Sequence, residues 1–103
     1  MSQAYPDRYV TVFDAAVNGS GSWHKVRDLM AVDSGVLTFI FKGTWNSGTM
    51  TLELAANAAA LNAISTTETL TADGSLTVAV SPDLYVRATL SGSGGGAIVG
   101  TAQ

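Results

Sequence analysis

The residues that could carry catalysis or bind a metal are few and scattered in this sequence. His24 is the single histidine, and there is no cysteine. A protein metal site recruits several His, Cys or carboxylate ligands, and Asp28 lies too far along an extended strand from His24 to share a site with it. A nucleophilic serine needs a histidine base oriented by a carboxylate, and no serine is placed to favour such a set. We therefore expect no catalytic residue and no metal ligand, and we interpret His24 as a surface or interface residue.

One stretch formally fits a nucleotide-binding fingerprint. Gly92-x-Gly94-x-x-Ala97 resembles the dinucleotide motif, which works because a helix begins at its end and directs amide groups at the pyrophosphate. The residues that follow, AIVGT, are typical of a strand, and the Gly-Lys-Ser/Thr of a phosphate loop is missing. The sequence therefore predicts no cofactor.

The charged side chains also lack the spacing of a reactive site. The eight carboxylates are spread singly, without the pattern of an acid–base pair or of an Asp-rich calcium loop. Tyr85 and Arg87 share one face of a strand, so the guanidinium could lie on the ring or pair with a carboxylate of a neighbouring strand. We interpret this pair as part of a structural surface ladder.

Composition bounds the class of protein. The 103 residues suffice for one domain with one core, and 47 % of them are apolar. Only 13 % are charged, against about 25 % in typical soluble domains, and the net charge is -3 without a basic run. Clustered Lys and Arg, which nucleic-acid binding needs, are therefore missing. Low charge of this kind is typical of interface cores, so the composition favours an assembly protein over a neutral extracellular-type β domain.

No segment has the pattern of an export signal or a membrane helix. The first ten residues contain no apolar signal core, and no run approaches about 18 apolar residues. We expect synthesis in a cytoplasm without export and no membrane partner; the resemblance described below implies that this cytoplasm is that of a bacterial host.

The stretch 36–55 is the strongest secondary-structure signal and predicts a β-hairpin. Apolar residues alternate with polar ones in both arms, which is typical of half-buried strands, and the inward set is Leu37, Phe39, Phe41, Met50, Leu52 and Leu54. A loop of two or four residues puts Trp45 opposite Met50 and Phe41 opposite Leu54, with Gly48 supplying the positive φ of the turn. Ile40 remains on the opposite face, which we expect to be partly covered.

The rest of the chain predicts short strands around this hairpin. We expect strands at 10–13, 23–29, 75–80, 84–90 and 97–101, a flexible hairpin loop at 91–96, and a helical turn or loop at 55–64. Six to eight short strands with such turn signals predict a single antiparallel β-sandwich, either jelly-roll or Ig-like. The predicted domain covers 10–103, and residues 1–9 form an extended N-terminal arm.

The segment 41–102 resembles small structural proteins of tailed bacteriophages. The matching pieces are Gly43-Thr44-Trp45 and the stretches 49–53, 70–74 and 84–92, whereas AANAAALNA departs from the family pattern. The resemblance implies a β-sandwich component of the virion without enzyme activity, most simply a capsid decoration or cement protein on the capsid surface. It also implies that the chain binds the major capsid protein and itself, with a trimer at local three-fold points as the favoured oligomer.

The arm offers candidate anchors for such contacts. Tyr5, Arg8 and Tyr9 are of the types enriched at interfaces, although a frayed terminus explains the arm equally well.

A carbohydrate- or receptor-binding module of a phage tail or head fibre is the alternative. Trp23, Trp45 and Tyr85 would then be exposed stacking platforms lining a groove, with carboxylates or amides beside them. A cement protein would instead have inward aromatics and a flat apolar or Thr-rich contact face.

Overall fold

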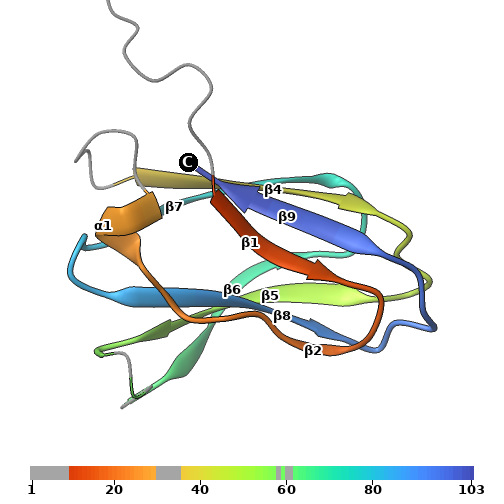
Figure 1. The fold of residues 1–103 in the computed structure, drawn as a ribbon, viewed down its shortest axis with the longest axis horizontal. Helices are drawn as coiled ribbons and strands as arrows, with labels where there is room; N and C mark the ends of the chain where they lie inside the picture. Colours follow the sequence, from red (N-terminus) through yellow and green to blue (C-terminus); the bar gives the residue numbers. More distant parts are fainter. Residues whose placement is uncertain (1–9, 30–35, 58, 60–61) are drawn as a thin grey trace, which may run out of the picture.

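The chain folds into two antiparallel β-sheets packed face to face (Figure 1). The computed structural model describes residues 10–29, 36–57, 59 and 62–103. Sheet A has the order β1-β9-β4-β7, and sheet B has the order β2-β8-β5-β6 with β3 also paired to β8. The predicted all-β sandwich is thus confirmed. The strands are β1 (Val10–Ala15), β2 (Gly19–Ser20), β3 (His24–Lys25), β4 (Val36–Gly43), β5 (Thr49–Ala55), β6 (Ile64–Leu70), β7 (Gly74–Ala79), β8 (Tyr85–Ser91) and β9 (Ile98–Ala102).

Strands β2 and β3 are two parts of one interrupted strand. Both lie antiparallel to β8, at successive positions along it, and between them the amide of Gly21 donates to the carbonyl of Ala88 at 2.8 Å. With β2 and β3 taken together, each sheet has four strands, and the chain crosses between sheets at every connection except β5–β6. Of the two sandwich types predicted, this strand order is that of a jelly roll.

The predicted hairpin at 36–55 is wrong, because β4 and β5 belong to different sheets. β4 pairs with β7 and β9, whereas β5 pairs with β6 and β8. The connection arches from one sheet to the other, with Asn46 and Ser47 at φ 44° and 70° and a 2.7 Å bond from the Gly48 amide to the Trp45 carbonyl. Left-handed backbone therefore falls on Asn46, a residue type that tolerates it, and on Ser47. The alternation of apolar and polar residues determines which face of a strand is buried, but not which strand pairs with it. An arch and a hairpin therefore bury the same residues.

Two further predictions need correction. The strand expected at 23–29 ends at Lys25, and the chain then turns into the short helix α1 (Val26–Leu29), which buries Val26 and Leu29 from one side of its single turn. The loop at 91–96 is not a hairpin loop, because it joins β8 of sheet B to β9 of sheet A. The other predicted strands agree with β1, β7, β8 and β9 within one or two residues.

The segment between β5 and β6 is a loop in its described part. Asn57 accepts a hydrogen bond from the Ala59 amide at 3.1 Å through its side-chain oxygen, which is a local turn. β6 then begins at Ile64.

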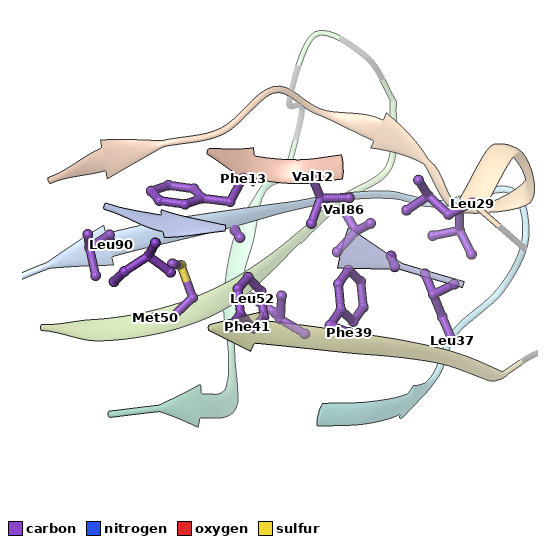
Figure 2. Packing of buried hydrophobic residues seen from close by; sticks show 14 of the residues in the cluster. Val12, Phe13, Leu29, Leu37, Phe39, Phe41, Met50, Leu52, Val86 and Leu90 are labelled. Atoms are coloured by element: carbon purple, nitrogen blue, oxygen red, sulfur yellow. The ribbon is translucent and has the colours of Figure 1, made fainter. Parts of the chain in front are cut away.

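The core lies between the sheets (Figure 2). Phe39 and Phe41 of sheet A and Leu52 of sheet B are buried as predicted, and the two phenyl rings are parallel with centroids 6.3 Å apart. Leu54 is only half-buried, because it lies where the sandwich opens beside β6 and β7. Gly100 of β9 sits opposite Phe41, and a Cβ atom there would overlap the Phe41 ring.

Candidate docking surface

The outer face of sheet A is neutral and rich in threonine. Because Leu37, Phe39 and Phe41 of β4 point into the core, the alternate residues of β4 point outward. The neighbouring strands continue the pattern through the cross-strand partners of these residues. We call this surface the threonine face; it comprises Thr11, Asp14, Val36, Thr38, Ile40, Lys42, Ser75, Thr77, Ala79, Val99 and Thr101.

Three large apolar side chains are exposed on the threonine face. Val36 is 46 % exposed, Ile40 47 % and Val99 42 %. Beside them the hydroxyls of Thr38 and Thr77 hydrogen-bond across β4 and β7 at 3.1 Å. The two charged residues of this defined face, Asp14 and Lys42, are of opposite sign. A surface of this kind brings few charges into a protein contact, as is typical of interface cores.

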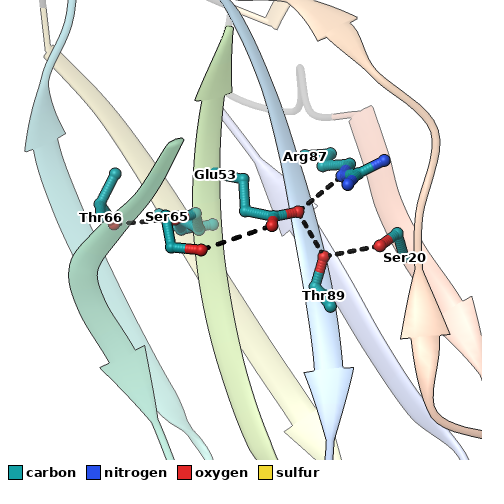
Figure 3. Close-up of polar contacts among 7 residues, drawn as sticks. Ser20, Glu53, Ser65, Thr66, Arg87 and Thr89 are labelled. Carbon is teal, nitrogen blue, oxygen red and sulfur yellow. Dashed lines mark hydrogen bonds and ion pairs between the residues drawn. The ribbon is translucent and has the colours of Figure 1, made fainter. Parts of the chain in front are cut away.

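The outer face of sheet B is occupied by a connected polar cluster (Figure 3). Glu53 of β5 lies at its centre and accepts hydrogen bonds from the Nε of Arg87 at 2.6 Å and the hydroxyl of Thr89 at 2.7 Å, both on β8. Ser65 of β6 donates to the second carboxylate oxygen at 3.5 Å, and Ser20 of β2 bonds the Thr89 hydroxyl at 2.8 Å. The cluster therefore links four neighbouring strands of sheet B.

Partners of Glu53 hold its carboxylate in the charged form. Burial by itself raises the pKa of the Glu53 carboxyl, but the hydrogen bonds from Thr89 and Arg87 and the charge of the guanidinium outweigh it, so the pKa lies below its ordinary value. Both side chains of the Arg87–Glu53 ion pair are largely covered. The three hydrogen bonds hold this carboxylate between neighbouring strands, so it has a structural role in sheet B.

Two of the three aromatic residues considered as sugar platforms make contacts within the fold. The guanidinium carbon of Arg87 lies 4.5 Å from the centre of the Trp23 ring and covers one face of it. Trp45 is buried, and its indole Nε1 donates to Asp73 at 2.8 Å. Tyr85 is half-buried on β8. The predicted pairing of Arg87 with a neighbouring carboxylate is thus confirmed, although the ring that it covers is Trp23 rather than Tyr85.

Asp73 is a residue whose role the sequence did not indicate. Besides Trp45, it accepts a 2.9 Å bond from the amide of Gly43. The bond from Trp45, followed by that from Gly43, lowers the pKa of the Asp73 carboxyl below its ordinary value. The turn between β6 and β7 is thereby fastened to the end of β4 and to the arch that follows it. The pairing of β4 with β7, which sets Phe41 opposite Gly74, brings these residues together, so no local motif announces the contact.

His24 and Asp28 do not form a joint site. His24 is half-buried on β3 and lines a shallow hollow of about 300 Å³ with Asp14 and Phe13. Asp28 lies on α1. Across the described ranges, no three His, Cys, Asp or Glu side chains gather in a way that could hold a metal ion.

A more enclosed hollow opens between the edge strands β6 and β7. Its volume is about 240 Å³, and it is lined by Leu52, Leu54 and Val86 from sheet B and by Val78 and Val80 from the segment around β7. Thr66 and Glu68 form its polar rim on β6.

The predicted arm contacts Tyr5, Arg8 and Tyr9 lie outside the described residues and stay predictions.

Among the residues that are described, no helix has the length and hydropathy needed to cross a lipid bilayer. No family model, curated protein or solved structure matches this chain.

Proposed function

We propose that this chain is a structural subunit of a bacteriophage particle, a decoration protein that lays its threonine face on the major capsid protein and stabilises the capsid without catalysis. The single observation that carries the proposal is that face, which is rich in threonine, contains only two charged residues and exposes three aliphatic side chains. The sequence resemblance to small phage structural proteins supplies the class of partner. The jelly-roll topology is compatible with it, because viral capsid domains are among the users of this fold, but fold alone does not decide function.

The size of the apolar set indicates how strongly one copy would bind. Complete burial of an aliphatic side chain contributes about 1.5–3 kcal/mol, and Val36, Ile40 and Val99 are each a little under half exposed. Covering all three therefore contributes about 2–4 kcal/mol, which is too little for firm binding by a single copy. Linked copies on a repeating lattice multiply such modest contacts through effective concentration.

The alternative of a carbohydrate-binding module has less support. Two of its three expected platforms make contacts inside the fold, since Arg87 covers one face of Trp23 and Trp45 is buried and hydrogen-bonded to Asp73. The carboxylate of this network, Glu53, is already bonded to Arg87 and Thr89.

Substitution of Ile40 by Asp tests the proposal. The side chain is exposed, so the fold should persist, but a carboxylate at the centre of the docking face would be buried unpaired on the capsid. The assay is occupancy on capsids of the virus that encodes this chain, after removal of the resident copy, measured by gel densitometry and electron microscopy. Thr69→Asp is the matched control, because it adds the same charge at an exposed site on β6 of the opposite sheet.

We expect Ile40→Asp to lose most of its occupancy and Thr69→Asp to bind like the wild type, with both variants melting normally. Equal occupancy of all three proteins would refute docking through the threonine face. No binding of the wild-type protein would refute the decoration role itself.

A further inference from the structure

The four sheet edges of the sandwich differ in how well they are protected against pairing with another strand. Natural edge strands are blunted by bulges, breaks, charges or proline. β1 has a register shift between Thr11 and Phe13 and carries Asp14. The edge strand beside β8 in sheet B is broken into two short pieces, β2 and β3. β6 has an irregular register opposite β5 and carries Glu68.

Strand β7 has none of these devices. Its sequence, GSLTVA, contains no charge and no proline, and it pairs with β4 in unbroken register from Gly74 to Ala79. It is also the end strand of sheet A among the described strands. An edge of this kind is a template for another strand.

The hydrogen bonds of Thr38 show which groups of β7 face outward. The amide and carbonyl of Thr38 both bond to Gln103, at 2.9 and 3.0 Å, so they point away from β7. Thr38 is the cross-strand partner of Thr77, which makes them a non-hydrogen-bonded pair. The amide and carbonyl of Thr77 therefore point to the free edge. By the alternation of an antiparallel ladder, those of Ser75 and Ala79 do the same.

We propose that this edge pairs with the same edge of a second copy of the chain, forming a two-fold dimer in which the two β7 strands run antiparallel about Thr77. In this register Thr77 faces Thr77 of the second copy, and Ser75 faces Ala79. All these residues present outward amides and carbonyls, so each facing pair exchanges two hydrogen bonds.

Several features fit a second copy as the occupant. A two-fold contact requires a self-complementary strand, and an uncharged one brings no like charges together. The hydroxyl bond between Thr38 and Thr77 would continue into the partner as a row of threonines on one face, a favourable cross-strand pairing. On the other face, the half-buried Leu76 and Val78 of the second copy would lie beside the open 240 Å³ hollow.

The dimer joins the two threonine faces into one eight-stranded surface, which would double the docking area proposed above. The dimer itself does not depend on that function. It differs from the trimer expected from the resemblance, because an isologous edge contact closes after two copies.

Disulfide cross-linking of single-cysteine variants tests this register directly, since the chain has no cysteine of its own. In the proposed dimer the Cα atoms of the two residues 77 are about 5.5 Å apart, within the range of a disulfide. The two copies of residue 75 are offset by four positions along the paired strands, so their Cα atoms are about 13 Å apart. We expect Thr77→Cys to form a covalent dimer under mild oxidation, while Ser75→Cys, the matched control, stays monomeric on non-reducing gels. Equal cross-linking of the two variants, or none in either, would overturn the proposal.

Paired charges give a second test that needs no new bond. Ser75→Lys with Ala79→Lys sets like charges opposite each other twice, whereas Ser75→Lys with Ala79→Glu sets opposite charges there. We expect the first variant to raise the Kd of dimerisation about tenfold or more and the second to return it to the wild-type value, as measured by sedimentation equilibrium. A wild-type protein that is monomeric at millimolar concentration, or an oligomer insensitive to the two lysines, would show that β7 is not the contact. Normal melting of both variants excludes misfolding as the cause.

Discussion

The ring of Phe41 and the absent side chain of Gly100 form one packing unit, so substitutions at the two positions should be strongly non-additive. Phe41 is fully buried, and truncation to Ala should lower the free energy of unfolding by about 3–5 kcal/mol. Gly100→Ala alone should cost about 1–3 kcal/mol, because its Cβ overlaps the Phe41 ring and the strand or the ring must shift.

The sign of the Gly100 effect should reverse once the ring is gone. In the Phe41→Ala background the new methyl enters the space that the ring has left. The φ of Gly100 lies outside the left-handed region, so Ala fits the backbone. It should then stabilise by about 0.4–1 kcal/mol, because it restricts the unfolded chain. The coupling energy between the two sites is therefore about 1.5–4 kcal/mol.

Urea unfolding of the four proteins, followed by fluorescence, measures the cycle. Gly94→Ala is the control, since a Cβ there meets only ordinary contacts at 3.6 Å or more, and we expect it to be near neutral. Additive effects of Phe41→Ala and Gly100→Ala would refute the close approach of β4 and β9 on which this reasoning depends. A Phe41→Ala variant melting within a degree or two of the wild type would refute the core itself.

Two further predictions concern the polar ties. Glu53→Gln removes the ion pair with Arg87 and should cost about 1 kcal/mol at pH 7, as measured by urea midpoint. The pKa values of Glu53 and Asp73 in the folded protein lie below their ordinary values of 4.5 and 3.8. On acidification the unfolded chain therefore takes up protons at these two carboxylates before the folded protein does. The stability that the two carboxylates contribute is complete above about pH 5 and is lost as the pH falls through the ordinary values toward the folded-state pKa values. The Gln variant should therefore lose less stability than the wild type between pH 5 and 3, and parallel pH profiles would contradict the assignment. Trp45→Phe keeps an aromatic ring at the site but removes the bond to Asp73, which should lower the melting temperature at pH 7 and reduce the acid sensitivity due to Asp73. An unchanged melting curve at pH 7 would show that this bond contributes nothing.

The sequence determines the buried faces of this fold better than the strand partners. The alternation around Phe39, Phe41 and Leu52 correctly predicts their burial, because period-2 patterning is a local property. It does not distinguish a hairpin from an arch, so the crossing at Trp45 to Gly48 could not be foreseen. The residues at 23–29 fit a strand, but Val26 and Leu29 are spaced equally well for one helical turn, and tertiary packing selects the helix from Val26 on.

For the threonine face, too, the sequence predicts which residues point outward but not which strands lie side by side. The outward position of Ile40 follows from alternation, and that of Val99 could have been found in the same way from Ile98 and Gly100. Their convergence on one face requires β9 to lie beside β4, which depends on pairing between residues distant in sequence. The bonds from Trp45 and Gly43 to Asp73 are equally non-local and had no sequence signal.

The placement of β9 between β1 and β4 has a consequence for how the chain acquires its structure. Residues 98–102 must be made before sheet A can close, and synthesis at the usual rate puts them about 3–10 s behind the end of β4. During that interval the β1 strand lacks its partner and the aromatic face of β4 is incompletely covered. Folding should therefore be slow, in milliseconds to seconds, as in other β-sandwiches dominated by distant pairings. A nascent chain stopped before Ile98 would expose that face and be a substrate for chaperones or aggregation.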